Sequence, residues 1–168
     1  MLRKSNKNDV EKIIEIIDEA KIYLKENNIP QWQDGYPNED TILEDIEKNQ
    51  SFVYEADNEI LGTAAIIIGK DKDYDKIYDG NWLTCDEPYI VVHRICVKKE
   101  SKGKAIATKI FDEVLNMAKE KNIKSIRVDT HRLNKSMQNS LLKNNFKKCG
   151  LVYLSGKDER FAFEKIVK

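Results

Sequence analysis

The spacing of apolar residues predicts where the helices and strands of this chain lie. Near the N-terminus, apolar residues recur at the three- and four-residue intervals of one helical face: Val10, Ile13, Ile14, Ile17 and Ala20. This spacing predicts an amphipathic helix that ends at about Asn27, after a short strand over 2–4. Asn6, with Asp9 three residues later, resembles a capping box in which Asp takes the place of Glu. The chain therefore begins as a strand followed by a capped helix.

Further along, apolar runs bounded by turn residues predict most of the sheet. Strands are expected over 51–56, 59–69, 89–97, 125–130, 146–153 and 160–167, the last two separated by a turn over 155–158. Further helices are expected at about 38–48, 105–121 and 135–145. Because Ala64–Ile68 is apolar on both faces, it is expected to be a buried strand. The order of elements predicts an α/β fold, a mixed sheet with helices on both faces.

Length and charge narrow the class of protein. The chain has 168 residues, which suits a single domain spanning 1–168. Its 29 Lys and Arg residues balance its 29 Asp and Glu residues, whereas nucleic-acid-binding proteins usually carry a strong basic excess. No stretch has the length and apolar character of a bilayer span, and the charged start is unlike a signal peptide. We therefore expect a cytoplasmic protein with no nucleic-acid or membrane partner.

The three cysteines give no sign of a metal centre. Cys85, Cys96 and Cys149 are widely separated, so they form neither a zinc knuckle nor a redox motif, and an odd number does not suit a disulfide framework. We expect no bound metal. Cys96 lies in an apolar run and is expected to be a small buried residue.

The segment from 98 to 109 carries the most informative chemistry. Here a buried strand passes through a glycine-containing turn directly into a helix, and a helix start offers unpaired N–H groups and a partial positive charge to phosphate. No acidic residue lies between 102 and 109, where helices usually place one. Lysines alternate with small residues instead: Lys102, Gly103, Lys104, Ala105 and Ala107. This pattern fits a pyrophosphate-binding loop, and the alternative is a solvated lysine-rich turn.

Two other phosphate-binding motifs do not fit this loop. A Walker loop needs Gly five residues before the pair Gly103-Lys104 and Ser or Thr after it, but Lys98 and Ala105 occupy those positions. A dinucleotide fingerprint that began at Gly103 would need Gly at the positions of Ala105 and Thr108. Neither nucleotide-binding class is therefore favoured.

The chain resembles the GNAT superfamily of N-acetyltransferases over essentially all of its length. The family's pyrophosphate loop reads Gln/Arg-x-x-Gly-x-Gly/Ala after a strand that ends in Val. Here Val97 precedes the loop 102–107, in which Ala107 matches while Lys102 and Ala105 replace the usual residues. Further matches, some typical of a bacterial subgroup, are Gln31-Trp32, Tyr36-Pro37, His93-Arg94, Arg127–His131, the helix-opening Asn134, Met137, and Asn145-Phe146 in place of Gly-Phe. Asn145 suits that place because Asn tolerates a left-handed backbone.

This resemblance implies a fold, a cosubstrate and a reaction. The fold would be the GNAT-like acyl-CoA N-acyltransferase fold, an α+β arrangement around a mostly antiparallel central sheet. The reaction would be direct attack of a primary amine on acetyl-CoA in a ternary complex. The implied cofactor-binding residues are Ile95, Cys96, Val97, Lys102, Gly103, Lys104, Ala105, Ile106, Ala107, Thr108 and Asn134. Of these, the strand 95–97 would pair with the pantetheine arm and supply an oxyanion-stabilising N–H group, and the loop amides would hold the pyrophosphate.

Proton transfer has several candidate residues. The general base is sought among His93, Asp129 and His131, because imidazole titrates near neutrality. The alternatives are a buried structural histidine at 93, an ion pair between Asp129 and Arg94, and a solvent-facing loop residue at 131. Strand alternation is expected to place Arg94 on the face opposite His93. Many family members protonate the leaving thiolate with a Tyr seven residues after the helix-opening Asn. Here that residue is Leu141, so Tyr153 becomes the candidate acid.

The acceptor amine is the least defined part of the prediction. The aromatic residues in or beside the predicted loops could wall an acceptor pocket or bind a cation: Trp32, Tyr36, Trp82 and Tyr89. Ordinary packing is the alternative. Asp86 and Glu87 could attract a cationic amine. The identity of the acceptor, a small molecule or a peptide, stays open. Whether the protein forms a homodimer also stays open. Two other function classes also remain: a sensor that binds acetyl-CoA without transfer, and a domain for a different phosphate ligand.

Overall fold

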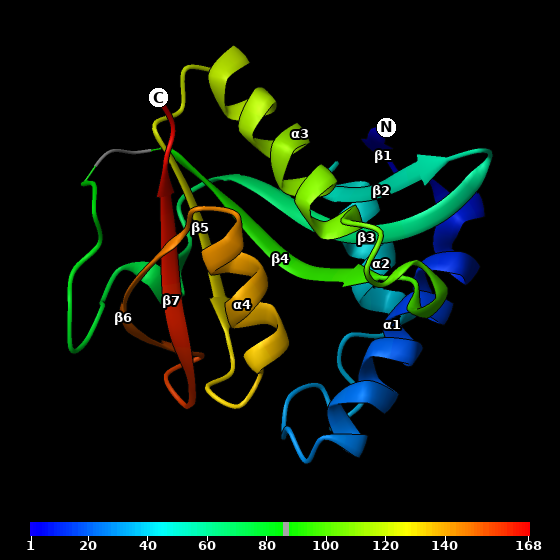
Figure 1. Ribbon diagram of the computed structural model, residues 1–168, viewed down its shortest axis with the longest axis horizontal. Coiled ribbons are helices and arrows are strands. Elements are labelled where there is room, and N and C mark those ends of the chain that lie inside the picture. The colour runs from blue at the N-terminus through cyan, green and yellow to red at the C-terminus, as the bar shows by residue number, and fades with distance from the viewer. Residues whose placement is uncertain (86–87) are drawn as a thin grey trace. The chain divides into compact units, whose positions relative to one another are not determined.

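The computed structural model describes residues 1–85 and 88–168, drawn as a ribbon in Figure 1. These residues form two compact units. The first unit contains residues 1–66 and 94–113, and the second contains residues 67–93 and 114–168. Two strands and one helix belong to both, because β3 (Glu59–Gly69), β4 (Tyr89–Val97) and α3 (Ile106–Glu120) continue from one unit into the other.

The elements of the first unit follow the predicted order closely. They are β1 (Leu2–Lys4), the 3-10 turn η1 (Lys7–Asp9), α1 (Val10–Glu26), α2 (Glu39–Glu47), β2 (Ser51–Ala56), the larger part of β3, the end of β4, the 3-10 turn η3 (Lys99–Ser101) and the start of α3. The predicted capping box is confirmed. Asn6 Oδ1 accepts from the N–H of Asn8 at 2.9 Å, and Asp9 Oδ2 accepts from the N–H of Asn6 at 2.8 Å. Asn38 caps α2 by accepting from the N–H of Thr41 at 3.0 Å.

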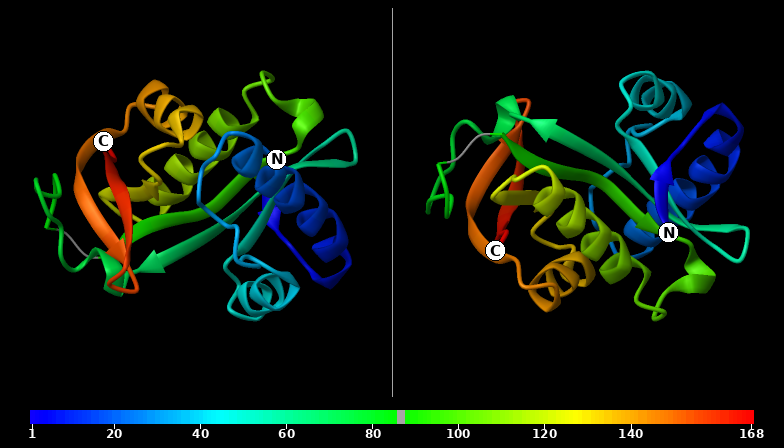
Figure 2. Two further views of the ribbon diagram at one scale, coloured as in Figure 1. Left: turned by 90° about the horizontal axis from the view of Figure 1, so that it is seen from below. Right: turned by 90° about the horizontal axis from the view of Figure 1, so that it is seen from above.

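Helices cover both faces of the sheet in the first unit, as predicted. On one face, buried apolar residues of α1 and α2 pack with Val53 of β2 and Cys96 of β4. On the other face lies Gly62, which pairs with Tyr54, the neighbour of Val53 in β2. A Cβ added at Gly62 would lie 3.0 Å from Ile110 Cδ1 of α3. Glycine at this position thus lets α3 lie close to the strand, and Figure 2 shows α3 on the side of β2 and β3 opposite α1 and α2.

The second unit contains the remaining strands. Its elements begin with the end of β3 and the 3-10 turn η2 (Lys72–Tyr74). After these come the start of β4, the end of α3, β5 (Ser125–Thr130), α4 (Lys135–Lys143), β6 (Lys147–Leu154) and β7 (Asp158–Ile166). β4 runs parallel to β5, whereas β5 and β6 each pair antiparallel with β7. The strand order is β1-β2-β3-β4-β5-β7-β6. The prediction of a mixed, mostly antiparallel sheet is confirmed.

Two boundaries in the second unit have clear physical causes. Asn145 has φ +64°, the left-handed conformation in which a helix ends, so the replacement of Gly by Asn is tolerated as predicted. The predicted turn over 155–158 is one residue too long. Asp158 pairs with Leu154 and therefore belongs to β7.

The polar excursion between β3 and β4 is attached to the edge strand β6. Tyr78 exchanges two backbone hydrogen bonds with Leu151, at 2.9 and 2.8 Å. The crossing is so close that a Cβ added at Gly80 would lie 1.8 Å from the carbonyl oxygen of Cys149. Only glycine fits there, and the contact also covers part of an exposed sheet edge.

A buried carboxylate fixes the following residues of the same excursion. Glu164 of β7 is 0% exposed and accepts hydrogen bonds from the N–H of Leu83 and the hydroxyls of Thr84 and Ser125. Arg127 of β5 provides the countercharge, with its Nε 3.3 Å from Glu164 Oε1. Since the two side chains are 5% and 0% exposed, each depends on the other for compensation of its charge.

The guanidinium of Arg127 is also held by aromatic rings. It lies 4.2 Å from the ring centroid of Trp82 and 4.0 Å from that of Tyr89, and its Nη2 donates to the carbonyl of Thr84 at 2.9 Å.

In the part of the chain described by the structure, no helix is both long enough and apolar enough to cross a bilayer.

Candidate active site

The loop after β4 leaves several backbone donors of α3 without acceptors inside the helix. The N–H of Lys109 bonds to the carbonyl of Ala105 at 3.0 Å. The N–H groups of Ile106, Ala107 and Thr108 precede that bond and therefore have no intrahelical partner. Ala107 and Thr108 are partly exposed.

Ala105 adopts the backbone conformation that explains the glycine of the family pattern. Its φ is +58°, in the left-handed region, and Gly103 before it has φ +83°. A residue with a Cβ pays about 1–2 kcal/mol for that conformation, whereas glycine adopts it freely. Ala105 thus adopts a backbone conformation that glycine would adopt without strain.

The charges around the loop fit an anion from outside the protein. The first turn of α3 holds no acidic residue. The carboxylate of Glu19 accepts from the N–H of Lys99 at 2.7 Å, in η3, before the loop begins. No hydrogen bond within residues 1–85 and 88–168 joins a carboxylate to the amides of 106–108. Lys102 lies with its Nζ 4.0 Å from the centroid of the Tyr23 ring.

The strand before the loop has an unusual backbone conformation at Arg94. Its φ is +52°, in the left-handed region. Arg94 Nη1 donates to the hydroxyl of Tyr36 at 2.7 Å, and Nη2 forms an ion pair with Asp45 of α2. The expected ion pair with Asp129 is therefore wrong, because the guanidinium is bound by Asp45 in the first unit.

Burial makes Cys96 a poor nucleophile although it lies in the strand assigned to the thioester. The side chain is 5% exposed, and burial raises its pKa to about 12. Burial and the nearby Glu164 likewise raise the pKa of Cys149 to about 11. A thiol with so high a pKa contains almost no thiolate at neutral pH, and thiolate is the reactive form.

Thiol labelling should therefore distinguish one cysteine from the other two. Cys85 is exposed, whereas Cys96 and Cys149 are buried. We expect one thiol per chain to react with an aromatic disulfide reagent within minutes at pH 8, and all three after unfolding in guanidinium. Prompt reaction of two thiols in the native protein, lost in Cys96→Ala, would contradict the buried position of Cys96.

In the second unit, His93 lies between two carboxylates. Its Nε2 is 2.8 Å from Asp71 Oδ2, and its Nδ1 is 3.7 Å from Asp129 Oδ2. Tyr74 donates its hydroxyl to the same oxygen of Asp129 at 2.6 Å, and Arg160 Nε lies 3.9 Å from the other oxygen. Of the proposed catalytic residues, the structure thus brings His93 and Asp129 together.

Asp71 and Tyr74 were not found from the sequence. Burial raises the pKa of Asp71, but hydrogen bonds from His93 and the N–H of Asp73 more than offset it, so that pKa lies below its usual value. Burial and Asp129 raise the pKa of Tyr74 well above its usual value, so its hydroxyl stays a neutral donor. The sequence signal that existed was the place of Asp71, two residues after the end of the predicted strand 59–69.

The other proton-transfer candidates lie apart from this hydrogen-bonded group. His131 Nδ1 accepts from the N–H of Leu133 at 3.1 Å, and burial together with Arg160 and Arg132 lowers the pKa of His131. Tyr153 packs edge-on against Tyr78, with the ring centroids 5.2 Å apart. Their catalytic roles stay predictions.

Two further positions bear on the family comparison. Asn134 is the N-cap of α4 and accepts from the N–H of Met137 at 3.1 Å. Leu141, where many family members have Tyr, is 0% exposed and belongs to the core. The usual acid position therefore offers an apolar side chain that solvent does not reach.

The four aromatic residues predicted to bind the acceptor differ in exposure. Tyr36 is 43% exposed and Tyr89 is 1% exposed. Trp32 is partly buried against the α1–α2 cluster, and Trp82 donates its Nε1–H to the carbonyl of Tyr74 at 2.9 Å. Acceptor binding by these residues stays a prediction, with Tyr36 the most accessible. Asp86 and Glu87 lie outside the described residues.

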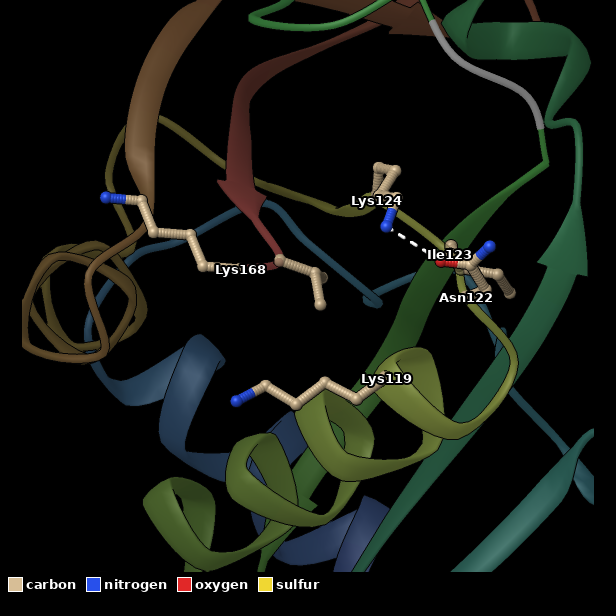
Figure 3. A pocket seen from close by; sticks show the side chains of 6 residues that line it. Lys119, Asn122, Ile123, Lys124 and Lys168 are labelled. Carbon is tan, nitrogen blue, oxygen red and sulfur yellow. Dashed lines mark hydrogen bonds between the residues drawn. The ribbon is translucent and has the colours of Figure 1, made fainter.

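The second unit also has a surface hollow of about 280 Å³ near the end of α3. It is lined by Lys119, Asn122, Ile123, Lys124, Val167 and Lys168. Figure 3 shows Lys124 bonded to Asn122, Nζ to Oδ1 at 2.7 Å. None of the predicted site residues lines this hollow.

Among the residues with described positions, no group of three or more His, Cys, Asp or Glu side chains could hold a metal ion.

Known proteins give independent evidence on the family. The family model described as "Acetyltransferase (GNAT) family" matches residues 13–146. A GNAT-family acetyltransferase from Streptococcus agalactiae 2603 is 32% identical, with a TM-score of 0.92, and the similarity covers 100% of this chain and 95% of that one. No curated protein matches the sequence closely enough to be called a relative.

Two more distant structures share the fold. A putative acetyltransferase from Staphylococcus aureus Mu50 is 28% identical, with a TM-score of 0.75 and coverage of 100% of this chain and 99% of that one. PaiA N-acetyltransferase from Thermoplasma acidophilum, in complex with coenzyme A, is 20% identical, with a TM-score of 0.71 and coverage of 99% and 98%. The family model, which spans the loop as well as Asp71, His93 and Asp129, and the 32% identical acetyltransferase from Streptococcus agalactiae establish that the chain belongs to the GNAT family of acetyltransferase enzymes.

Proposed function

We propose that this enzyme transfers the acetyl group of acetyl-CoA to a primary amine by direct attack within a ternary complex. The observation that carries the proposal is the start of α3, where the amides of Ile106, Ala107 and Thr108 lack intrahelical partners and no acidic residue competes for them. Such a helix end favours a diphosphate. The complex of the Thermoplasma acidophilum relative with coenzyme A supports the same cosubstrate.

Direct attack is favoured over an acetyl-enzyme intermediate. The cysteine in the strand assigned to the thioester is Cys96, whose raised pKa of about 12 leaves it protonated. A covalent route would need an activated nucleophile. The acceptor amine therefore attacks the thioester carbonyl itself, and a backbone N–H of the strand 95–97 stabilises the oxyanion.

His93 is the base in this proposal. Its Nε2 is engaged with Asp71, so Nδ1 receives the proton of the attacking nitrogen as the C–N bond forms. Nδ1 and Asp129 Oδ2 are 3.7 Å apart, too far for a direct hydrogen bond but suitably spaced for one amine to donate to both. The thiolate of CoA then leaves and takes a proton from water, since Leu141 cannot supply one.

The test of this function is acetyl transfer by the wild-type enzyme and by His93→Ala. We expect the variant to lower kcat about 100-fold, the range of general base catalysis, with unchanged affinity for acetyl-CoA. Release of CoA from acetyl-CoA in the presence of a panel of amines measures turnover, and titration calorimetry measures affinity. His131→Ala, measured in the same assays, tests the other candidate histidine. Equal rates for wild type and His93→Ala from pH 6 to 9 would remove His93 from the mechanism.

The second candidate function is a sensor that binds acetyl-CoA without transferring the acetyl group. It is favoured by Leu141, which replaces the usual acid. Tight acetyl-CoA binding with no transfer to a broad panel of small amines and peptides would support the sensor. A cytoplasmic location and a homodimer stay predictions.

A further inference from the structure

We propose that Asp71 is a positioning residue that holds His93 as its Nε2–H tautomer and stabilises the imidazolium formed when His93 takes the proton of the amine. This inference rests on the proposed function and extends it to a residue outside the strands and the loop of the family pattern. Asp71 lies two residues after the end of β3, and its Oδ2 lies 2.8 Å from His93 Nε2.

Hydrogen bonds hold both the backbone and the carboxylate of Asp71. Its N–H donates to the hydroxyl of Tyr89 at 2.8 Å, and the same hydroxyl lies 3.3 Å from its carbonyl. Its Oδ1 accepts from the N–H of Asp73 at 2.9 Å and so caps η2. Because the cap uses only one carboxylate oxygen, a purely structural role leaves the bond from Oδ2 to His93 unexplained.

The charge balance indicates that Asp71 acts on His93. In the described part of the chain, His93 is the only cationic partner within ion-pair distance of Asp71, and both side chains are 19% exposed. Asp129 differs, because Tyr74 and Arg160 already lie against its two oxygens. The carboxylate of Asp71 is thus available to His93, whereas the carboxylate of Asp129 is shared.

The hydrogen bond to Asp71 decides which nitrogen can act. An ionised carboxylate only accepts hydrogen bonds, so His93 must donate Nε2–H to it, and the lone pair of the neutral ring lies on Nδ1. When Nδ1 takes a proton from the attacking nitrogen, that nitrogen loses one positive charge and the ring gains one. Asp71 and Asp129 then stabilise the cation, as the carboxylate of a catalytic triad does.

The dependence on pH follows from the groups that face His93. They are Asp71 from the segment after β3, Tyr74 from η2 and Asp129 from β5, with Arg160 of β7 against the far oxygen of Asp129. Replacing Asp71 by an uncharged residue makes protonation of His93 harder. The acidic limb of the kcat/KM profile is therefore expected to move to lower pH.

The experiment compares wild type with Asp71→Asn by 15N NMR of histidine and by kinetics. The chain has two histidines, so His131→Gln leaves the signal of His93 alone. In wild type we expect the Nε2–H tautomer. In Asp71→Asn we expect the acidic limb of kcat/KM to move to lower pH. We also expect kcat to fall at least about tenfold, with KM for acetyl-CoA unchanged.

Asp75→Asn is the matched control. Asp75 lies in the same segment, is 46% exposed at its side chain, and pairs with Lys70 at 3.4 Å. It should leave both the tautomer and the pH profile unchanged. Wild-type His93 in the Nδ1–H tautomer, or an unshifted acidic limb of kcat/KM in Asp71→Asn, would overturn the role of Asp71. Because NMR needs no turnover, absence of transfer in wild type would refute the proposed function and leave the tautomer a separate result.

Discussion

Glu164→Gln is expected to lower the free energy of unfolding by about 3–5 kcal/mol, the cost of removing one partner of a buried ion pair. Glu164 is 0% exposed and accepts from Leu83, Thr84 and Ser125 as well as from Arg127. Glutamine has nearly the same shape but carries no charge and replaces one acceptor oxygen with a donor NH2. The NH2 group of glutamine would then face N–H or O–H groups that donate to Glu164 in the wild type.

The larger part of this cost comes from Arg127. Its guanidinium stays charged at any ordinary pH and is 5% exposed, so it would be left buried without a countercharge. Its contacts with Trp82 and Tyr89 compensate only partly, because an aromatic face attracts a cation less strongly than a carboxylate does. Urea denaturation followed by tryptophan fluorescence and by circular dichroism measures the change.

Glu159→Gln is the matched control on the same strand. Glu159 pairs with Arg132, and the two side chains are 29% and 54% exposed. A surface ion pair contributes about 1 kcal/mol or less, so this variant should unfold almost as wild type does. If both variants lost the same free energy of unfolding, the buried ion pair of Glu164 would contribute no more to stability than the surface ion pair of Glu159.

Local sequence rules accounted for most of the fold. A capping residue such as Asn6 acts on N–H groups two or three positions away, so it can be identified from spacing alone. Strand alternation and apolar runs likewise predicted the strands of both units within one or two residues. These features depend on neighbours in the chain, which a sequence displays directly.

Contacts between distant residues account for what could not be predicted. The partner of Arg94 was misassigned because Asp45 lies 49 residues away in α2, and nothing in the residue type Arg signals that contact. Asp71 was missed as the partner of His93, 22 residues away, since one more Asp in a polar excursion is indistinguishable from a solvated one. Such pairs depend on how segments far apart in the sequence come together in the fold. The family motifs also do not include the segment around Asp71.

Ala107→Glu is expected to weaken acetyl-CoA binding at least about 100-fold while leaving the protein as stable as wild type or slightly more so. Ala107 is the second residue of α3, where its side chain is partly exposed beside the free amides. A carboxylate in a first helical turn usually stabilises the helix by about 0.3–1 kcal/mol. The same carboxylate about 4 Å from a phosphate would repel it by roughly 4 kcal/mol at an effective dielectric constant of about 20.

The opposite signs of these two effects make the variant informative. A solvated lysine-rich turn would show the gain in stability alone, whereas a pyrophosphate site loses its ligand as the helix becomes more stable. Ala107→Gln supplies the steric control, because glutamine has the size of glutamate without its charge. Calorimetric titration with acetyl-CoA and thermal unfolding of both variants provide the measurements. If glutamine and glutamate weakened binding equally, bulk would be responsible, and the electrostatic basis assigned to the loop would be wrong.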